Sequence, residues 1–181
     1  MTAPTLVVVS GPAGSGKTTL AHRLASALGC PAICRDEIKE GMVHAAQGFV
    51  AAPGDELTGR TLPVFFGVLD LLLRAGVTTV AEAAFQDKVW RPRLESLTGL
   101  ARLRIVHCIV DPGLTFERSR RRRRETPSRR AHADPDDAAE HARAHRAFDR
   151  VSMDAPYLEV DTTDGYRPSL DEIVAFINGH G

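Results

Sequence analysis

Residues 11–18 decide the fold of this chain, and they read Gly-Pro-Ala-Gly-Ser-Gly-Lys-Thr. A short apolar run, Leu6–Ser10, precedes this stretch, and apolar residues recur at helical spacing over residues 17–28. A strand, the pattern Gly-x-x-x-x-Gly-Lys-Thr and a helix together predict a phosphate-binding loop, whose backbone amides meet the positive end of the helix dipole. We expect Lys17 to neutralise the β- and γ-phosphates of a nucleotide, and Thr18 to offer its hydroxyl to Mg²⁺.

This motif predicts a set of consecutive nucleotide-binding residues. They are Gly11, Ala13, Gly14, Ser15, Gly16, Lys17, Thr18 and Thr19. The competing dinucleotide pattern would begin at Gly14 and needs a third glycine at position 19. Because Thr19 stands there, the sequence excludes that pattern.

Apolar runs and helical patterns alternate along the 181 residues. The expected strands cover residues 6–10, 31–34, 77–81, 103–110 and 157–160. The expected helices cover residues 17–28, 37–47, 56–74 with a kink or a start at Pro63, 89–97, 112–125, 134–150 and 169–177. Continuously apolar strands separated by helices predict a three-layer α/β fold with a five-stranded parallel sheet, forming one domain over residues 1–181. Ligands of such sheets bind beyond the carboxyl ends of the strands.

The composition narrows the class of protein. The chain has 23 Lys plus Arg and 23 Asp plus Glu, which argues against a generally basic nucleic-acid-binding surface. No apolar run approaches the roughly 18 to 20 residues of a membrane span, and residues 1–10 do not resemble a signal peptide. We therefore expect a cytoplasmic protein without a membrane partner, a monomer or a homodimer. Its three cysteines are expected to be reduced thiols, because Cys30 and Cys34 lack the second ligand pair of a zinc site.

The second expected strand is followed by an acidic residue that could take part in chemistry. Asp36 would project from the carboxyl edge of the sheet, where a carboxylate can accept the proton of an attacking hydroxyl. Asp36 is therefore our candidate general base. The same side chain is also a candidate N-cap of the following helix, and the two roles can coexist.

The third expected strand ends at Glu82, where many P-loop proteins place an aspartate that holds Mg²⁺ through water. We name Thr18 and Glu82 as candidate metal ligands. Two other roles for Glu82 stay open: binding the acceptor, and orienting Lys39 or an arginine. Asp111 follows the fourth strand, but Asp-Pro at the start of a helix indicates a cap.

Arginines are concentrated in one segment of the chain. They make up 20 of the 23 basic residues, and eight of them fall between residues 118 and 130. Such a run can bind nucleic acid or serve as a targeting signal, but here it follows the fourth strand, where a lid would lie. Helical spacing pairs Arg118 with Arg122 and Arg120 with Arg124, and guanidinium groups grip phosphate oxygens in a bidentate way. We therefore predict an Arg-rich helical lid over residues 116–137, with a mobile polar loop from residue 125 onward.

These motifs together resemble a known group. The first motif is the run Gly11–Thr19, and Arg35-Asp36-x-x-Lys39 follows it. A strand ending at Glu82 and an Arg-rich helix after Asp111 come next. This order of motifs resembles P-loop kinases of the predicted-kinase, AAA-33-like group. This group is similar to the kinase domain of phage polynucleotide kinase, and more distantly to chloramphenicol phosphotransferase and the zeta toxins. The resemblance covers nearly the whole chain.

The resemblance implies roles for particular residues. Asp36 would be the general base, and lid arginines would grip the donor phosphates: Arg118 on the nucleotide, Arg120 and Arg124 on the group in transfer. The segment Asp161-Thr162-Thr163 would lie where these kinases bind adenine, beneath a lid arginine, although it also fits a turn with Asx hydrogen bonding. Thr162 is named as the nucleotide-binding residue.

Other residues complete the predicted acceptor side. We expect Asp36, Lys39, Glu82 and Phe85 to bind the acceptor, with Phe85 or Trp90 partly exposed among the aromatic residues. His141 and His145 have a spacing that a metal site could use. They lack an accompanying glutamate, so they are expected to lie on a solvated helix face.

The function predicted is an ATP- and Mg²⁺-dependent kinase that transfers the γ-phosphate to a hydroxyl of a small molecule. The acceptor is left open among nucleosides, sugars and antibiotics, so a resistance phosphotransferase is one option. Two alternatives also stay open. One is a polynucleotide 5′-hydroxyl kinase, and the other is a hydrolytic nucleotide switch that would use Gln86 to position water.

Overall fold

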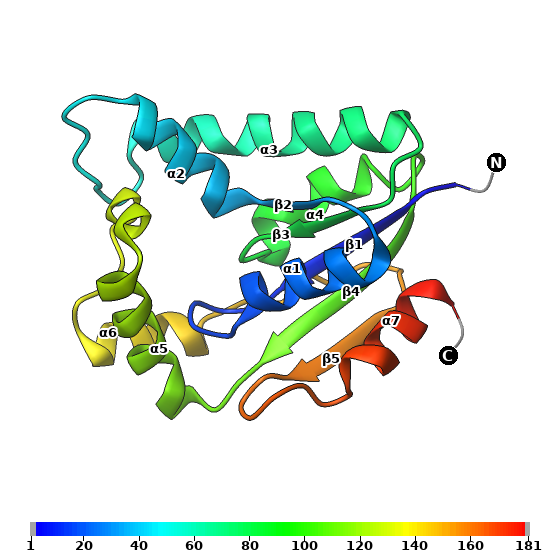
Figure 1. Ribbon diagram of the computed structural model, residues 1–181. Coiled ribbons are helices and arrows are strands. Elements are labelled where there is room, and N and C mark those ends of the chain that lie inside the picture. The colour runs from blue at the N-terminus through cyan, green and yellow to red at the C-terminus, as the bar shows by residue number, and fades with distance from the viewer. Residues whose placement is uncertain (1–2, 180–181) are drawn as a thin grey trace.

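A parallel sheet forms the centre of the molecule (Figure 1). The computed structural model describes residues 3–179, and in this part of the chain the strand order is β2-β3-β1-β4-β5. The strands are β1 Thr5–Ser10, β2 Ala32–Cys34, β3 Thr79–Glu82, β4 Arg102–Ile109 and β5 Tyr157–Asp161. Every pair of neighbouring strands runs parallel, and every residue of the central strand β1 is buried. The predicted five-stranded parallel sheet is confirmed.

Helices connect the strands. They are α1 Lys17–Leu28, α2 Arg35–Ala45, α3 Glu56–Arg74, α4 Asp87–Glu95, α5 Pro112–Glu125, the 3-10 helix η1 Pro127–Ala131, α6 Ala138–Arg146 and α7 Leu170–Asn178. Helix α3 begins at Glu56 rather than at Pro63, because the Asp55 carboxylate caps it. Helix α6 ends before Arg150, because the Asp87 amide bonds the Asp149 carbonyl and draws this segment away from the helix.

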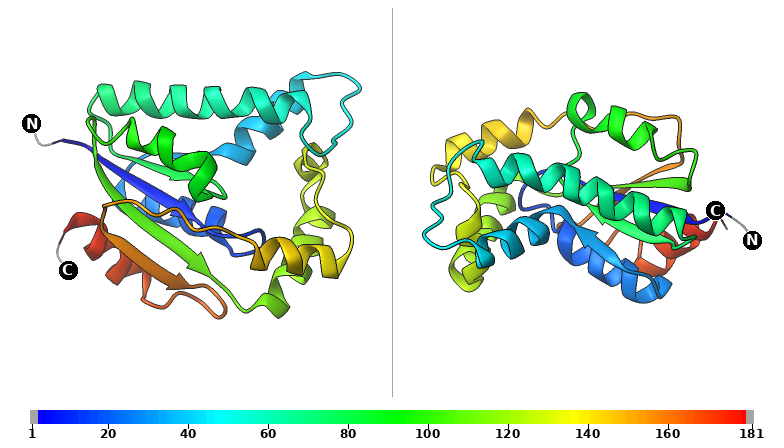
Figure 2. Two further views of the ribbon diagram at one scale, coloured as in Figure 1. Left: turned by 180° about the vertical axis from the view of Figure 1, so that it is seen from behind. Right: turned by 90° about the horizontal axis from the view of Figure 1, so that it is seen from above.

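The two faces of the sheet are covered by different helices, which makes the predicted three layers (Figure 2). On β1, Leu6 and Val8 pack with α3 and α4, whereas Val7 and Val9 pack with α1 and α7. This alternation follows from the pleat of a strand, which turns successive side chains to opposite faces. Both faces of a central strand must therefore be apolar, as the continuous run in the sequence indicated.

The segment that follows β4 forms the lid beyond the carboxyl ends of the strands (Figure 1). It comprises α5, η1 and α6. The expected mobile loop after residue 125 is instead partly ordered as η1, because Ala131 is fully buried against Val43 of α2 and Leu57 of α3. The lid therefore rests on α2.

Within residues 3–179, no helix is both long and apolar enough to cross a membrane. Helix α3, which has 19 residues, also carries charged and polar side chains. Its buried residues, such as Phe65 and Leu69, face the core, whereas Arg60 and Arg74 form exposed ion pairs within the helix.

Candidate active site

A cavity of about 920 Å³ lies between the carboxyl edge of the sheet and the lid. The phosphate loop and the start of α1 form its floor, the end of β2 and the segment after β3 form one side, and α5 with η1 forms the other. Its walls include Ala13, Gly14, Gly16, Lys17, Thr18, Thr19, Asp36, Arg118 and Thr162. All nine were predicted from the sequence to contact the nucleotide or the acceptor, and the fold brings them together from four segments of the chain.

The phosphate loop has the backbone that its glycines allow. Gly14 has a φ of 78° and Gly16 a φ of 74°, in the left-handed region that favours glycine. A Cβ on Gly14 would lie 2.5 Å from the Thr115 carbonyl oxygen of α5, so the lid helix approaches this glycine directly. Gly16 then begins α1, whose free amides face the cavity as an anion site. The Ser15 hydroxyl is buried without a hydrogen-bond partner among the described residues, as expected of a loop built around a ligand.

Lys17 and Thr18 face Glu82 at the base of the cavity. The Glu82 carboxylate accepts a hydrogen bond of 3.3 Å from the Thr18 hydroxyl and lies 3.8 Å from the Lys17 ammonium. Glu82 is only 2% exposed, so burial raises its pKa, while the charge of Lys17 opposes the increase. A hydroxyl and a buried carboxylate are oxygen ligands of the kind Mg²⁺ uses. The residues present therefore fit a phosphate-bound Mg²⁺ held by Thr18 and Glu82, with Lys17 on the phosphates.

The far end of the cavity suits a nucleobase. The Arg118 guanidinium donates to the Thr162 carbonyl at 3.1 Å and to the Thr163 carbonyl at 2.8 Å, which ties α5 to the loop after β5. Beside it, Arg23 stacks over the Tyr166 ring at 5.5 Å, and both side chains line the cavity. The Thr163 amide also donates a hydrogen bond to the Asp161 carboxylate, so the predicted Asx turn is present. The Arg23 guanidinium and the Tyr166 ring are planar groups on the same cavity wall.

Two arginines hold the candidate general base. Asp36 lies in the first turn of α2 and not at its N-cap, and its two carboxylate oxygens accept bonds of 3.1 Å from Arg35 and from Arg129. Burial raises the pKa of Asp36, but His132, Lys17, Arg129 and Arg35 outweigh it and lower that pKa well below the ordinary range. Asp36 is therefore ionised at neutral pH and presents a carboxylate to the cavity.

Sequence reasoning missed Arg129. This residue is 8% exposed, and besides Asp36 it binds both carboxylate oxygens of Asp134, at 3.0 and 2.7 Å. It also lies 3.6 Å from Glu40 of α2, which further accepts a 2.6 Å bond from the Ser128 hydroxyl. Arg129 was counted among the arginines of the lid segment, but it lay in the expected loop after the run at 118–124, so no role was assigned to it.

The structure contradicts two of the predicted acceptor residues. Lys39 is 3% exposed and donates to the Asp55 carboxylate at 2.7 Å and to the Thr58 hydroxyl at 2.8 Å, so it joins α2 to the start of α3. A lysine buried this deeply needs such partners, and they leave it outside the cavity wall. Phe85 is fully buried in the core, whereas Trp90, 8% exposed, does line the cavity.

The structure also contradicts the roles given to Arg120 and Arg124. Both line a separate, smaller depression on the other side of α5, and Arg120 pairs with Glu117 at 3.6 Å. The two pairs of i, i+4 arginines point in different directions, and the pair that faces the nucleotide cavity is Arg118 with Arg122. The Arg122 guanidinium lies 3.5 Å from the Thr18 hydroxyl, which makes it the lid arginine beside the phosphate loop.

A further correction concerns the histidines of α6. His141 is 5% exposed and packs beside the Phe116 ring, with 5.7 Å between the ring centroids, so it does not lie on a solvated face. Burial lowers its pKa. Helix α6 folds back on α5, and this places His141 on the cavity wall.

A comparison with protein families finds one model that matches most of the chain. The family model AAA_33, described as an AAA domain, matches residues 6–155, from the first strand to just before β5. The chain belongs to the AAA_33 family. No curated protein matches this AAA_33 chain.

Solved structures share the fold of this AAA_33 protein. A proposed kinase from Chloroflexus aurantiacus superposes with a TM-score of 0.86 at 22% identity, covering 99% of this chain and 100% of that chain. A sugar kinase from Janibacter gives 0.66 at 19% identity, with 98% and 95% covered. Shikimate kinase from Acinetobacter baumannii, solved with shikimate, gives 0.60 at 19% identity, with 99% and 95% covered. These similarities confirm the P-loop kinase fold.

Proposed function

We propose that this protein is an ATP- and Mg²⁺-dependent kinase that transfers the γ-phosphate to a hydroxyl group of a small molecule. One observation carries the proposal: a single cavity holds the phosphate loop, lid arginines and an ionised aspartate at the end of β2. The fold shared with small-molecule kinases supports it, since the acceptors named for two of those proteins are a sugar and shikimate.

The residues divide the work of transfer. Lys17 and Arg122 would hold the donor phosphates, whereas Arg118 would line the nucleobase end of the cavity. Ammonium and guanidinium groups that are already in place stabilise the charge on the transferred phosphoryl group. Mg²⁺, held through Thr18 and Glu82, would neutralise phosphate charge and orient the γ-phosphate for in-line attack.

Asp36 would orient the acceptor hydroxyl and receive its proton. Its lowered pKa makes it a weak base, which is compatible with phosphoryl transfer because the transition state is loose and the hydroxyl proton leaves late. Arg35 and Arg129 hold the two carboxylate oxygens, so they fix the direction in which Asp36 faces the cavity. Positioning is therefore the larger part of its contribution.

The acceptor side of the cavity favours a small molecule with polar and apolar parts. Val89 and Trp90 offer apolar surface, and Gln86 and Arg35 offer hydrogen-bond donors. Sugars, nucleosides and hydroxyl-bearing antibiotics have this mixed character, and the last class would make the protein a resistance phosphotransferase. A polynucleotide acceptor would instead show binding that falls steeply with salt.

The test is ADP release from ATP with a panel of these acceptors, comparing the wild-type protein with Asp36→Asn. We expect an acceptor that increases ADP release. The variant should bind ATP with nearly the same Kd while turnover falls at least about 100-fold, the lower range for loss of general-base catalysis. Unchanged turnover in the variant would remove Asp36 from the mechanism. ADP release that no hydroxyl compound increases would favour the hydrolytic switch, for which Gln86 is already on the cavity wall.

A further inference from the structure

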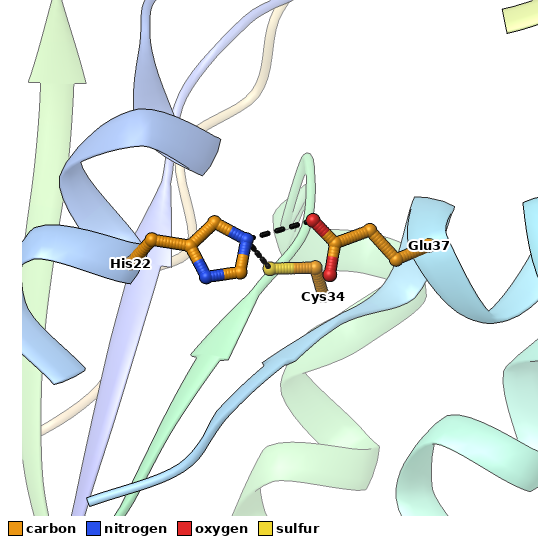
Figure 3. A group of neighbouring side chains, drawn as sticks. All are labelled: His22, Cys34 and Glu37. Carbon is orange, nitrogen blue, oxygen red and sulfur yellow. Dashed lines mark hydrogen bonds and ion pairs between the residues drawn. The ribbon is translucent and has the colours of Figure 1, made fainter. Parts of the chain in front are cut away.

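Three side chains from separate elements converge on the rim of the cavity (Figure 3). His22 of α1, Cys34 at the end of β2 and Glu37 of α2 place one nitrogen, one sulfur and one carboxylate oxygen within 4.8 Å of one another. The His22 Nε2 lies 2.7 Å from the Glu37 Oε1 and 3.7 Å from the Cys34 Sγ. His22 also lines the cavity, so the group is open to solvent on that side.

The spacing matches a tetrahedral metal centre. With ligand bonds of the lengths usual for zinc, a sulfur and a nitrogen on one ion lie about 3.5 Å apart, close to the separation of Cys34 and His22. The Glu37 oxygen would have to move away from the His22 nitrogen by about 0.7 Å, and its side chain is 44% exposed.

The charges also suit a divalent cation. A thiolate and one carboxylate neutralise two positive charges, while a histidine adds a neutral nitrogen. The Cys34 thiol is buried, and the Glu37 carboxylate lies in the same group of donors, so a cation that replaces the thiol proton would have a carboxylate close by.

A simple ion pair between α1 and α2 would explain less of this arrangement. His22 and Glu37 could form that pair at the surface without any sulfur, and both are about half exposed. The Cys34 thiol, however, is turned from the sheet edge toward the same nitrogen. Sulfur, imidazole and carboxylate together form the mixed donor set of zinc rather than the oxygen set of magnesium.

We propose that His22, Cys34 and Glu37 form a binding site for Zn²⁺ or a similar divalent transition metal, with solvent completing the coordination. Binding forms the metal–sulfur bond, releases the thiol proton to solvent and involves no oxidation. Its donor set differs from the Thr18 and Glu82 oxygen pair, although Cys34 and Glu82 are register partners on adjacent strands. It would tie α1 to the first turn of α2, in which Asp36 lies.

The experiment uses Co²⁺ as a spectroscopic probe on the whole protein, without nucleotide. We expect a near-ultraviolet charge-transfer band from sulfur to cobalt, together with the intense visible bands of tetrahedral cobalt, and their loss when Zn²⁺ is added. Cobalt bound at Thr18 and Glu82 gives no sulfur band, so the readout separates the two sites. It also requires no kinase activity.

Two variants and a control test the ligands. His22→Gln changes a side chain that is 50% exposed, so it should fold normally and weaken Zn²⁺ binding at least about tenfold. Cys34→Ser should remove the sulfur band, whereas Cys30→Ser, a half-buried thiol outside the cluster, should keep it. Absence of the band in the wild-type protein would overturn the proposal. So would a band that survives in Cys34→Ser, or Zn²⁺ affinity unchanged by His22→Gln.

Discussion

Replacing Arg129 by methionine tests whether the lid supports the candidate base. The methionine keeps most of the apolar length of the side chain but leaves three acidic groups, Asp36, Asp134 and Glu40, without their shared positive partner. Breaking a buried ion pair costs roughly 3–5 kcal/mol. Here Asp36 and Asp134 are 30% and 23% exposed, so water recovers part of that cost, and we expect a loss of about 2–3 kcal/mol in the free energy of unfolding.

Urea and thermal unfolding measure this loss. For a domain of this size it corresponds to a Tm lower by about 4 to 12 °C. Arg130→Met is the matched control, because the neighbouring arginine is exposed and makes no ion pair among the described residues. ADP release should also fall in Arg129→Met, because Asp36 loses one of its two fixed contacts. Equal unfolding free energies for the two variants, within about 0.5 kcal/mol, would refute the bridging role.

Three further predictions concern the lid, the loop and a buried ion pair. Arg122→Gln should lower kcat at least about tenfold, whereas Arg120→Gln on the other side of α5 should leave it unchanged; equal effects in steady-state assays would contradict the assignment. Gly14→Ala should weaken ATP binding measured by calorimetry at least about tenfold, because the added Cβ meets the backbone of α5, and an unchanged Kd would show that the loop adapts. Burial raises the pKa of Asp55, but hydrogen bonds from Lys39 and Thr58 lower it to about 2, so its stabilisation is present above about pH 4 and is lost as the pH falls toward 2. Urea unfolding of Asp55→Asn should therefore depend less on pH in that window, and slopes equal to those of the wild-type protein would contradict the pairing.

The secondary structure was largely predictable because local patterns dictate it. Helix α1 and helix α5 have the predicted bounds, since Gly29 ends α1 in a left-handed conformation and the Asp111 carboxylate caps the start of α5. The prediction failed where distant contacts intervene. Helix α6 is shorter than its pattern because Asp149 bonds the start of α4, and η1 forms where a loop was expected because Ala131 finds a pocket between α2 and α3.

The site was partly predictable for the same reason. The phosphate loop is a local motif, so its residues follow from the consecutive positions 11–19. Lys39 and Phe85 could not be placed in this way, because their surroundings come from residues far away in the sequence. The sequence also does not show which arginines of α5 face the cavity, because this depends on how the helix packs in the fold.

The phosphate loop, the parallel sheet and the edge of the sheet that carries the site could be predicted from local sequence, because glycine conformations, apolar periodicity and strand polarity are properties of neighbouring residues. Which charges meet depends on the packing of the whole fold. Arg129 reaches Asp36 across 93 positions of the sequence, and His22, Cys34 and Glu37 meet from three elements. Such encounters depend on how helices pack, and the energy of a buried charge depends on the partners that packing provides.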